Sequence, residues 1–209
     1  MGIIDTSSNT IERLMCIANT GVQIIFRYYA SAVNWKVITP SEAQAISNAE
    51  MQIGVVFEDG VNLDSFTKQN GIAHATSAYQ YAKETIKQPF GSAIFFAIDL
   101  NVTDNQINNN IIPYFEGIKE ALNKLSQPNE TYKVGAYGCG AAVNALMDLK
   151  LCDYRWLSSS TSFNGTQQAL DGGNYEMAQH FNANAEVCNI GVDHNTLREG
   201  VTDIGAFKL

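Results

Sequence analysis

Short apolar runs that end in a polar residue alternate with helical patterns over residues 1–150, and this alternation constrains the fold more than any other feature. Each run is followed by a segment whose apolar residues recur at helical spacing. A strand–helix alternation repeated in this way predicts a parallel sheet. The predicted strands cover residues 3–5, 23–30, 52–59, 93–100 and 133–138.

Two of the predicted helices carry start signals. Thr39 is followed by Pro40 and Glu42, which place a capping residue, a proline and an acid in the first turn. Asn9 and Glu12 have the spacing of a capping box. The other predicted helices cover residues 71–87, 107–125, with a kink at Pro113, and 141–150.

The last third of the chain is rich in strand patterns and poor in helical ones. Residues 154–158, 175–181 and 188–193 predict three further strands. The last two are too close for a parallel crossover, so we expect a hairpin. The predicted α/β fold is a barrel with five helical crossovers, roughly (β/α)5β3 and helix-poor in the C-terminal third. Because no linker divides the sequence, residues 1–209 are expected to form a single domain.

Composition excludes several classes of protein. Hydrophobic residues make up 45% of the chain, which argues against disorder. The net charge of −8 and the absence of cation clusters argue against a nucleic-acid partner. No apolar window is long enough for membrane insertion. The first residues carry no Sec-type signal, so we expect synthesis in the cytoplasm with export by a non-classical route or secretion system, or membership of a longer chain.

Four cysteines stand too far apart in the sequence for a zinc-binding pair of the CxxC type. We expect Cys16, Cys139, Cys152 and Cys188 to be small buried thiols, with a disulfide left open as the alternative. No metal site and no cofactor is predicted.

Three acids follow predicted strands, and they are the best candidates for chemistry. Asp5, Glu58 and Asp99 each stand at a strand end, and parallel strand ends line one mouth of an α/β barrel. Crowded carboxylates raise one another's pKa, which suits the cleavage of a glycosidic bond by an acid and a carboxylate. The alternative is that each acid caps a helix or meets solvent. Asp99 is the strongest signal, because it interrupts an apolar run.

At this point several motifs resemble a known family. In order they are residues 2–6 (GIIDT), 27–29 (RYY), 39–42 (TPSE), 95–99 (FFAID), 135–138 (GAYG) and 191–193 (GVD). The ordered set is similar to the bacterial glycoside-hydrolase-like domain of unknown function numbered 1906, which resembles the glycoside hydrolase 25 muramidases. The resemblance implies a modified TIM barrel with a reduced set of helices, acting on peptidoglycan or another cell-wall glycan.

One departure from the muramidase pattern bears on activity. Those enzymes carry Asp-x-Glu on the fourth strand, and the Glu is their proton donor, whereas this chain has Asp99, Leu100 and Asn101. Either another acid has taken that role, with Glu58 as the predicted donor, or hydrolysis is lost.

Asp193 resembles the last-strand Asp of the muramidases. In a hairpin over the predicted strands, Gln179 and Asp193 would lie at opposite ends. Only one of the two would then face the mouth, unless a bulge intervenes.

Aromatic and polar residues are candidates for substrate binding. Tyr29, Tyr137 and Trp156 would stack on sugars or, alternatively, fill the core. Arg27 alternates with Tyr29 and is expected to point the same way and to pair with Asp5 or Asp99. Asn101 and Gln179 complete the predicted binding set.

The leading hypothesis is a lysozyme-like hydrolase of peptidoglycan or a related polysaccharide, with Asp5, Glu58, Asp99 and Asp193 as catalytic residues. A glycan-binding barrel without catalysis is the second hypothesis, motivated by Asn101. A minor alternative is a hydrolase that uses Cys139 as nucleophile, with His180 as its base. A secretion machinery and an immunity protein are further candidate partners.

Overall fold

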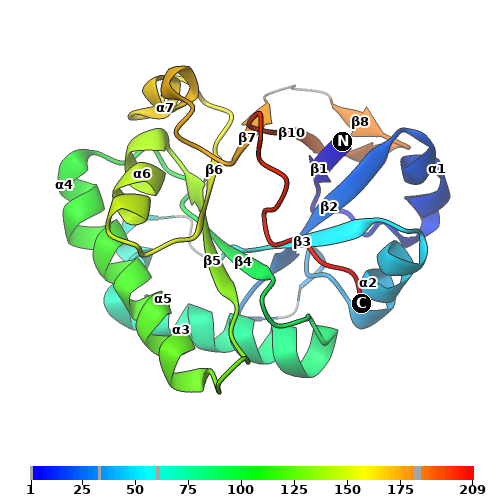
Figure 1. The fold of residues 1–209 in the computed structure, drawn as a ribbon, viewed down its shortest axis with the longest axis horizontal. Helices are drawn as coiled ribbons and strands as arrows, with labels where there is room; N and C mark the ends of the chain where they lie inside the picture. The colour runs from blue at the N-terminus through cyan, green and yellow to red at the C-terminus, as the bar shows by residue number, and fades with distance from the viewer. Residues whose placement is uncertain (1, 33, 60–61, 181–184) are drawn as a thin grey trace.

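The computed structural model describes residues 2–32, 34–59, 62–180 and 185–209, and strands β1–β7 and β10 form a closed barrel at its centre (Figure 1). Around the barrel the strands follow the order β1-β10-β7-β6-β5-β4-β3-β2. A separate two-stranded sheet pairs β8 with β9. The strands are β1 (Gly2–Asp5), β2 (Val22–Tyr29), β3 (Gln52–Phe57), β4 (Ala93–Ala97), β5 (Lys133–Gly138), β6 (Tyr154–Leu157), β7 (Met177–His180), β8 (Glu186–Val187), β9 (Ile190–Gly191) and β10 (Asp193–Leu197).

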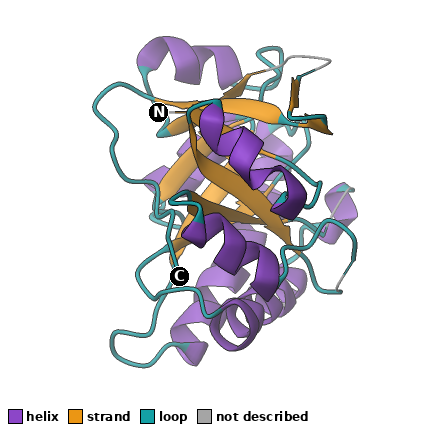
Figure 2. Ribbon diagram, turned by 90° about the vertical axis from the view of Figure 1, so that its right-hand side faces the viewer, coloured by secondary structure: helices purple, strands orange, loops and turns teal. Residues whose placement is uncertain are grey.

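Helices pack around the outside of the barrel, as Figures 1 and 2 show. The α-helices are α1 (Leu14–Asn19), α2 (Pro40–Asn48), α3 (Lys68–Gln80), α4 (Asp104–Gln106), α5 (Ile112–Leu125), α6 (Gly140–Asp148) and α7 (Thr166–Gly172). A π-helical turn, Ile107–Ile111, joins α4 to α5 just before Pro113, and a second, Tyr81–Ile86, extends α3. Proline lacks the amide hydrogen of a regular helix, which accounts for an irregular turn at the first site.

The cap signals in the sequence had different outcomes. The prediction at Thr39 is confirmed, because its side chain accepts a hydrogen bond from the Glu42 amide at the start of α2. The predicted capping box of Asn9 and Glu12 is wrong. Asn9 instead accepts a bond from the Ile11 amide, and a short 3-10 turn precedes α1.

The predicted α/β barrel is confirmed, with one helical crossover more than expected. Strands β1 to β7 pair in parallel around the barrel, while β10 runs antiparallel to both of its neighbours. The short helix α7 makes a sixth crossover, from β6 to β7. Its seven residues carry too little helical periodicity to predict it from the sequence.

Alternate residues of each strand divide the interior into two apolar clusters. The cluster inside the barrel includes Phe26, Phe95 and Trp156, whose rings contact one another. The larger cluster lies between the barrel and the helices. Gly54 and Gly135 leave room for the Phe26 and Phe95 rings, because a Cβ at either glycine would overlap a ring. Side chains therefore fill the interior of the barrel below its mouth.

The final barrel strand lies later in the chain than the sequence predicted. The β8–β9 sheet occupies part of the expected strand 188–193, and β10 begins only at Asp193. On β10, Asn195 pairs with Gln179 of β7. The connection between β7 and β10 is longer than the sequence predicted, so Gln179 and Asp193 lie at the same end of the barrel. The expectation that only one of them faces the mouth is therefore wrong.

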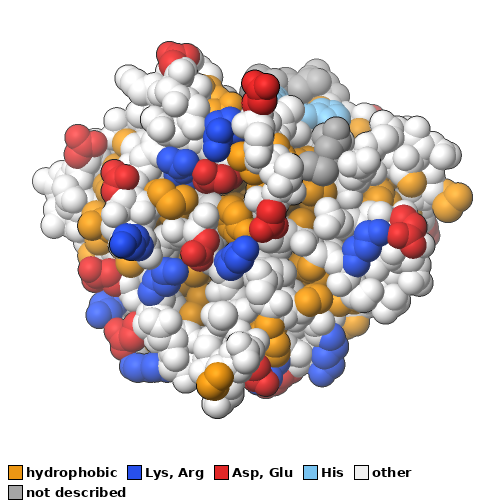
Figure 3. Space-filling view, in the orientation of Figure 1, with side chains coloured by type: hydrophobic (Ala, Val, Ile, Leu, Met, Phe, Trp, Pro, Cys, Tyr) orange, Lys and Arg blue, Asp and Glu red, His pale blue; other side chains and the backbone are white. Residues whose placement is uncertain are grey.

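The C-terminal segment covers the end of the barrel at which the parallel strands begin. Phe207 pairs with Ile53, the Gly205 carbonyl accepts from the Ala93 amide, and Asp203 bonds Lys133. Figure 1 shows this segment crossing in front of the strands. In the same orientation, Figure 3 shows acidic and basic side chains interspersed over this face. The opposite end, where the parallel strands finish, is left for a site.

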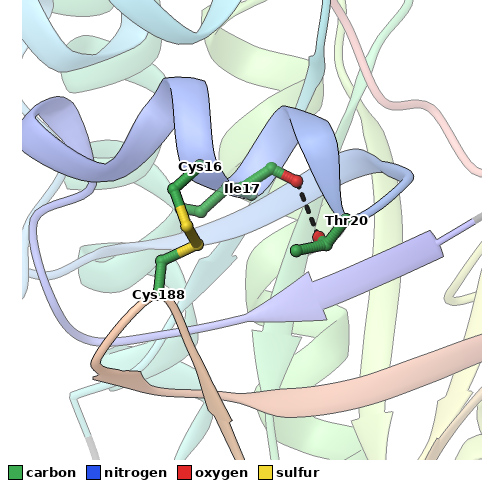
Figure 4. The surroundings of a disulfide bond; sticks show 4 residues. All are labelled: Cys16, Ile17, Thr20 and Cys188. Carbon is green, nitrogen blue, oxygen red and sulfur yellow. Dashed lines mark hydrogen bonds between the residues drawn. A yellow bond between two sulfur atoms is a disulfide. The ribbon is translucent and has the colours of Figure 1, made fainter.

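A disulfide joins the β8–β9 turn to the first helix (Figure 4). Cys188 lies in that turn and Cys16 lies on α1, 172 positions earlier in the chain. The expectation of four buried thiols is therefore wrong for this pair, whereas Cys139 and Cys152 are free and buried. Sequence spacing does not reveal the pairing, because the barrel brings its first and last elements together only on closure.

Candidate active site

A cavity of about 330 Å³, here called the central cavity, opens at the carboxyl ends of the parallel strands. Four carboxyl groups line it, from four different strands or the loops that follow them: Asp5, Glu58, Asp99 and Asp193. All four predicted catalytic residues thus share one cavity. The other lining residues are Tyr28, Val56, Ala97, Tyr137, Trp156, Ser159 and Gln179.

Asp5 is the most buried of the four, with 2% of its surface exposed. Its Oδ2 accepts hydrogen bonds from Nδ2 of Asn195 at 2.7 Å and Nε2 of Gln179 at 3.1 Å. Burial raises its pKa to about 7, against the lowering effect of these two donors, and the charges of Asp193 and Asp99 add to the rise. Near neutral pH, this carboxyl group therefore gains or loses a proton readily.

Asp193 lies directly opposite Asp5 in the antiparallel pairing of β1 with β10. Residues opposite one another in such a pair have Cβ atoms about 4.5–5.5 Å apart. Burial raises the pKa of Asp193, and the nearby His194 partly counteracts this. Two carboxyl groups from adjacent strands thus face the same space.

Asp99 lies two residues beyond β4, at the rim of the cavity. Its partial burial raises its pKa, and the charges of Glu58 and Asp193 raise it further. Asp99 is therefore not buried as an isolated charge. In the sequence it interrupts an apolar run, and in the structure that interruption falls where β4 ends at the mouth of the barrel.

Glu58 forms an ion pair with Lys36, whose Nζ lies 3.1 Å from its Oε2, and both side chains are 23% exposed. Lys36 also lies over the ring of Tyr28, 5.1 Å from its centre. The Glu58 carboxylate is thus engaged by a neighbouring cation at the edge of the cavity. The arrangement suits an electrostatic role better than proton donation.

Hydrogen bonds connect the predicted binding residues to Asp5. The Tyr137 hydroxyl donates to Oε1 of Gln179, whose amide nitrogen donates to Asp5. Nε1 of Trp156 donates to Oδ1 of Asn195, whose amide nitrogen also donates to Asp5. Tyr137, Trp156 and Gln179 therefore do lie at the cavity. Trp156 is only 2% exposed and packs in the barrel core, which matches the alternative stated for it.

Arg27 and Tyr29 lie elsewhere, and the expectation for them is wrong. Both are fully buried on the helix side of β2. Arg27 forms an ion pair with Glu42 of α2 at 2.8 Å and donates to the Thr6 carbonyl, rather than pairing with Asp5 or Asp99. The Tyr29 hydroxyl donates to Gln88. Their shared direction along the strand was predicted correctly, but that direction leads away from the barrel interior.

Asn101 also lies away from the central cavity. Its Oδ1 accepts from the backbone amide of Asn164, and it lines a separate surface cavity with Ser162 and Asp104. The position that carries the proton donor in the muramidase motif therefore faces a different part of the surface in this chain. This contradicts the expectation that Asn101 sits among the mouth residues.

Sequence reasoning missed three residues of the site: Tyr28, Lys36 and Asn195. Tyr28 has the opposite parity to Arg27 and Tyr29 and so points into the mouth. The sequence did hold a signal for Tyr28. Arg27 lies between apolar residues and therefore requires a buried partner on its own face of the strand, which leaves the neighbouring Tyr28 on the opposite face. No sequence signal marks Lys36 or Asn195, because their partners come from distant segments.

A second cavity of about 430 Å³, here called the side cavity, adjoins the first. Asp5, Tyr28 and Asp193 line both cavities. The loop after β1 and the segment before β10, which includes β8 and β9, supply the remaining wall: Thr6, Ser7, Ser8, Ala185, Glu186, Gly191 and Val192. Asp5 and Asp193 therefore lie where the two cavities adjoin.

The rival cysteine chemistry has no geometric support. Cys139 is fully buried in the apolar layer beneath the helices. His180 is exposed on β7 and bonds the Thr196 hydroxyl.

Within the described residues, no group of three or more His, Cys, Asp or Glu side chains could hold a metal ion. None of the described helices combines the length and the apolar character needed to cross a membrane.

A closed α/β barrel with carboxyl groups gathered at one mouth has the architecture of a glycoside hydrolase-like protein. The chain belongs to the Rv2525c-like family of glycoside hydrolase-like domains, whose family model matches residues 15–200. It is 33% identical over 136 residues to the Bacillus subtilis protein FadG, a match that covers 61% of this chain and 22% of FadG. The chain thus corresponds to about a fifth of the length of that relative.

Several solved structures share the fold. The Tat-secreted protein Rv2525c of Mycobacterium tuberculosis, in complex with L-tartrate, superposes with a TM-score of 0.76 at 20% identity, covering 95% of this chain and 96% of that one. The modular autolysin LytC of Streptococcus pneumoniae, in complex with a synthetic peptidoglycan ligand, gives a TM-score of 0.59 at 13% identity, covering 93% of this chain and 46% of LytC. At these identities the likeness concerns the fold alone.

Proposed function

We propose that this protein hydrolyses a cell-wall glycan of the peptidoglycan type at the junction of the two cavities. One observation carries the proposal: carboxyl groups from four strand ends line a single cavity. Glycosidic cleavage needs an acid for the leaving oxygen and a second carboxylate on the other side of the bond. A glycan that crosses both cavities passes Asp5 and Asp193, which line each of them.

Asp5 is the proposed proton donor. A general acid works best when its pKa lies near the working pH, and burial raises the pKa of Asp5 to about 7. Sequence reasoning gave the role of proton donor to Glu58. We assign it to Asp5 instead, because the Glu58 carboxylate is already engaged in an ion pair with Lys36. Glu58 then contributes negative charge that stabilises a cationic transition state.

Asp193 and Asp99 are the proposed partner carboxylates. The cross-strand position of Asp193 opposite Asp5 suits a close pair of the kind found in retaining glycosidases. Asp99 faces the same cavity from β4, where it adds electrostatic stabilisation. Tyr28 and Tyr137 are the aromatic side chains at the mouth that a sugar ring would contact.

A glycan-binding barrel without catalysis is the second candidate. The observation in its favour is Asn101, which replaces the acid of the muramidase motif and faces away from the cavity. A barrel of this kind would keep the polar cavity and its tyrosines but lack a productive acid–carboxylate pair. The two candidates share a ligand class and differ only in turnover.

Three observations support a polysaccharide partner outside the cytoplasm. LytC, with the same fold, was solved with a synthetic peptidoglycan ligand, and the family member Rv2525c is Tat-secreted. The Cys16–Cys188 disulfide suits an oxidising environment. We propose export on these grounds. A secretion machinery and an immunity protein stay as predictions.

The test is digestion of purified peptidoglycan sacculi, with released fragments identified by mass and reducing end. The active protein should release fragments, and Asp5→Asn should not. Glu199→Gln serves as the matched control, because Glu199 is an exposed acid after β10, at the far end of the barrel. If the unaltered protein binds sacculi yet releases nothing at any pH from about 4 to about 8, the glycan-binding barrel replaces the hydrolase.

A further inference from the structure

Building on the proposed glycan-binding function, we infer that the side cavity selects a sugar unit that carries a free, protonated amine over its N-acetylated counterpart. The substrate class would then be an amino-sugar glycan that has lost acetyl groups. The argument rests on the shape of the cavity, on the groups that line it and on the rigidity of its wall.

The side cavity has room for a sugar unit and continues into the central cavity. Its volume of about 430 Å³ falls in the range of small-molecule sites. Asp5, Tyr28 and Asp193 belong to both linings, so a chain of sugars can pass from one cavity to the other. The unit in the side cavity is therefore the neighbour of the unit that meets the proposed catalytic pair.

Carboxyl groups are prominent among the polar groups that line this cavity. Oδ1 of Asp5 accepts no hydrogen bond from the described residues, although the Asp5 side chain is almost fully buried and its other oxygen has two donors. Asp193 and Glu186 contribute two more carboxyl groups. An ammonium group carries three donors and no acceptor, and so it matches a site of this composition.

An acetamide fits the same groups less well. It offers one N–H donor, and its carbonyl oxygen requires a donor in return. The side-chain donors of the lining are the hydroxyls of Ser7, Ser8, Thr6 and Tyr28, and the Thr6 hydroxyl already bonds the Gly191 carbonyl. The balance of donors and acceptors therefore favours an amine over an amide at this position.

The charge balance favours a cation as well. No Lys or Arg occurs among the described residues that line either cavity, and the neighbouring Lys36 is paired with Glu58. His194, beside Asp193, is the titratable base near the cluster. A bound ammonium group would relieve the repulsion among carboxylates that contributes to the raised pKa of Asp5 and Asp99.

The wall of the side cavity is held in place before any ligand arrives. The Cys16–Cys188 disulfide ties the β8–β9 turn to α1 (Figure 4), and the Thr6–Gly191 hydrogen bond of 2.7 Å joins the two sides of the cavity. On the other side, Arg27 and Glu42 hold the Thr6 carbonyl and the Thr10 amide. A preorganised set of acceptors binds a cation without the cost of ordering loops.

Binding measurements on matched sugars test the inference independently of turnover. Calorimetry would compare the glucosamine tetramer with the N-acetylglucosamine tetramer at about pH 6, at low and high salt. We expect the amine form to bind at least about tenfold more tightly at low salt, with much of the difference lost at high salt. Glu186→Gln should reduce the preference several-fold, whereas the control Glu199→Gln should keep it.

Two results would overturn the inference. One is equal or tighter binding of the acetylated tetramer, and the other is binding of neither tetramer. These results are separate from failure of the hydrolase proposal. A protein that digests sacculi but shows no amine preference contradicts only the inference, whereas one that prefers the amine and releases no fragments contradicts only hydrolysis.

Discussion

Nδ2 of Asn195 donates a 2.7 Å hydrogen bond to Oδ2 of Asp5, across the junction of the barrel's first and last strands. The same side chain accepts from Nε1 of Trp156 at 2.8 Å. Asn195 thus connects the barrel core to the proposed proton donor. It favours the charged form of Asp5, in opposition to the burial that favours the neutral form.

Replacing Asn195 should shift the protonation of Asp5. Asn195→Leu removes a donor that stabilises the carboxylate, so the pKa of Asp5 is expected to rise above its present value of about 7. Carbon-13 NMR of the labelled Asp5 carboxyl group would follow the titration. The variant also leaves the Trp156 N–H without its acceptor, which is expected to cost about 1–3 kcal/mol of stability. An unchanged or lower pKa would contradict this reading of the hydrogen bond.

Asp5 should make stability depend on pH in a definite direction. Its pKa is raised from 3.8 to about 7 in the folded protein, so between these pH values the folded state holds a proton that the unfolded state releases. The stabilisation is complete below about pH 4 and disappears as the pH rises through about 7, a change of up to roughly 4 kcal/mol. Asp5→Asn removes this dependence and keeps an oxygen to accept from Asn195 and Gln179.

Urea unfolding at about pH 5 and about pH 8 checks this expectation. Asp5→Asn should be more stable than the unaltered protein at the higher pH, while its digestion of sacculi falls by more than about 100-fold. A gain in stability together with a loss of activity is typical of a strained active-site residue. A variant that loses stability equally at both pH values would show that Asp5 serves the fold instead.

Asp99 should matter for activity but little for stability. It lies at the exposed rim, and its nearest charges, Glu58 and Asp193, repel it. Asp99→Asn removes a charge that would stabilise an oxocarbenium-like transition state, so sacculus digestion should drop by about 100-fold or more. The free energy of unfolding should stay within about 0.5 kcal/mol of the original value. Full activity in this variant would remove Asp99 from the mechanism.

The pH profile of Glu58→Gln separates two candidates for the proton donor. If Asp5 is the donor, Glu58→Gln lowers turnover by about 10-fold or more but keeps the loss of activity above about pH 7. If Glu58 were the donor, that alkaline limb would vanish together with the activity. Lys36→Met is the matched variant, because it removes the cation from the ion pair while leaving the carboxyl group in place. Asn101→Glu should not recover any of the activity lost in Glu58→Gln, because the side chain at position 101 faces Asn164.

Loss of the disulfide should destabilise the protein. Cys16→Ser opens a loop closed over 172 positions, for which chain-entropy arguments give about 2–5 kcal/mol. A reducing agent should lower the stability of the unaltered protein to that of the variant and leave the variant unchanged. Cys152→Ala provides a control for the free buried thiol. Equal urea midpoints for the unaltered protein with and without reductant would contradict the expectation.

Local pattern was sufficient to predict the barrel. The parallel strands β1 to β5 and the helices between them follow from apolar runs and helical spacing, since burial on both faces and helical periodicity leave direct traces in the sequence. The same reasoning placed Asp5, Glu58 and Asp99 at one mouth, because parallel strand ends must converge in a closed barrel, whereas Asp193 was expected there from the resemblance to the muramidases.

What the sequence determined by itself was therefore the alternation of elements and the acids at their ends. The tertiary structure decided which face of β2 points inward, so that Tyr28 reaches the mouth while Arg27 pairs with Glu42 in the helix layer. It also decided the partners of Asp5 and the Cys16–Cys188 bond. The alternation of side chains along a strand places them on two opposite faces, but it does not show which face points into the barrel. The contacts of Asp5 and Cys16 join segments more than 170 positions apart, and these segments meet only when the barrel closes.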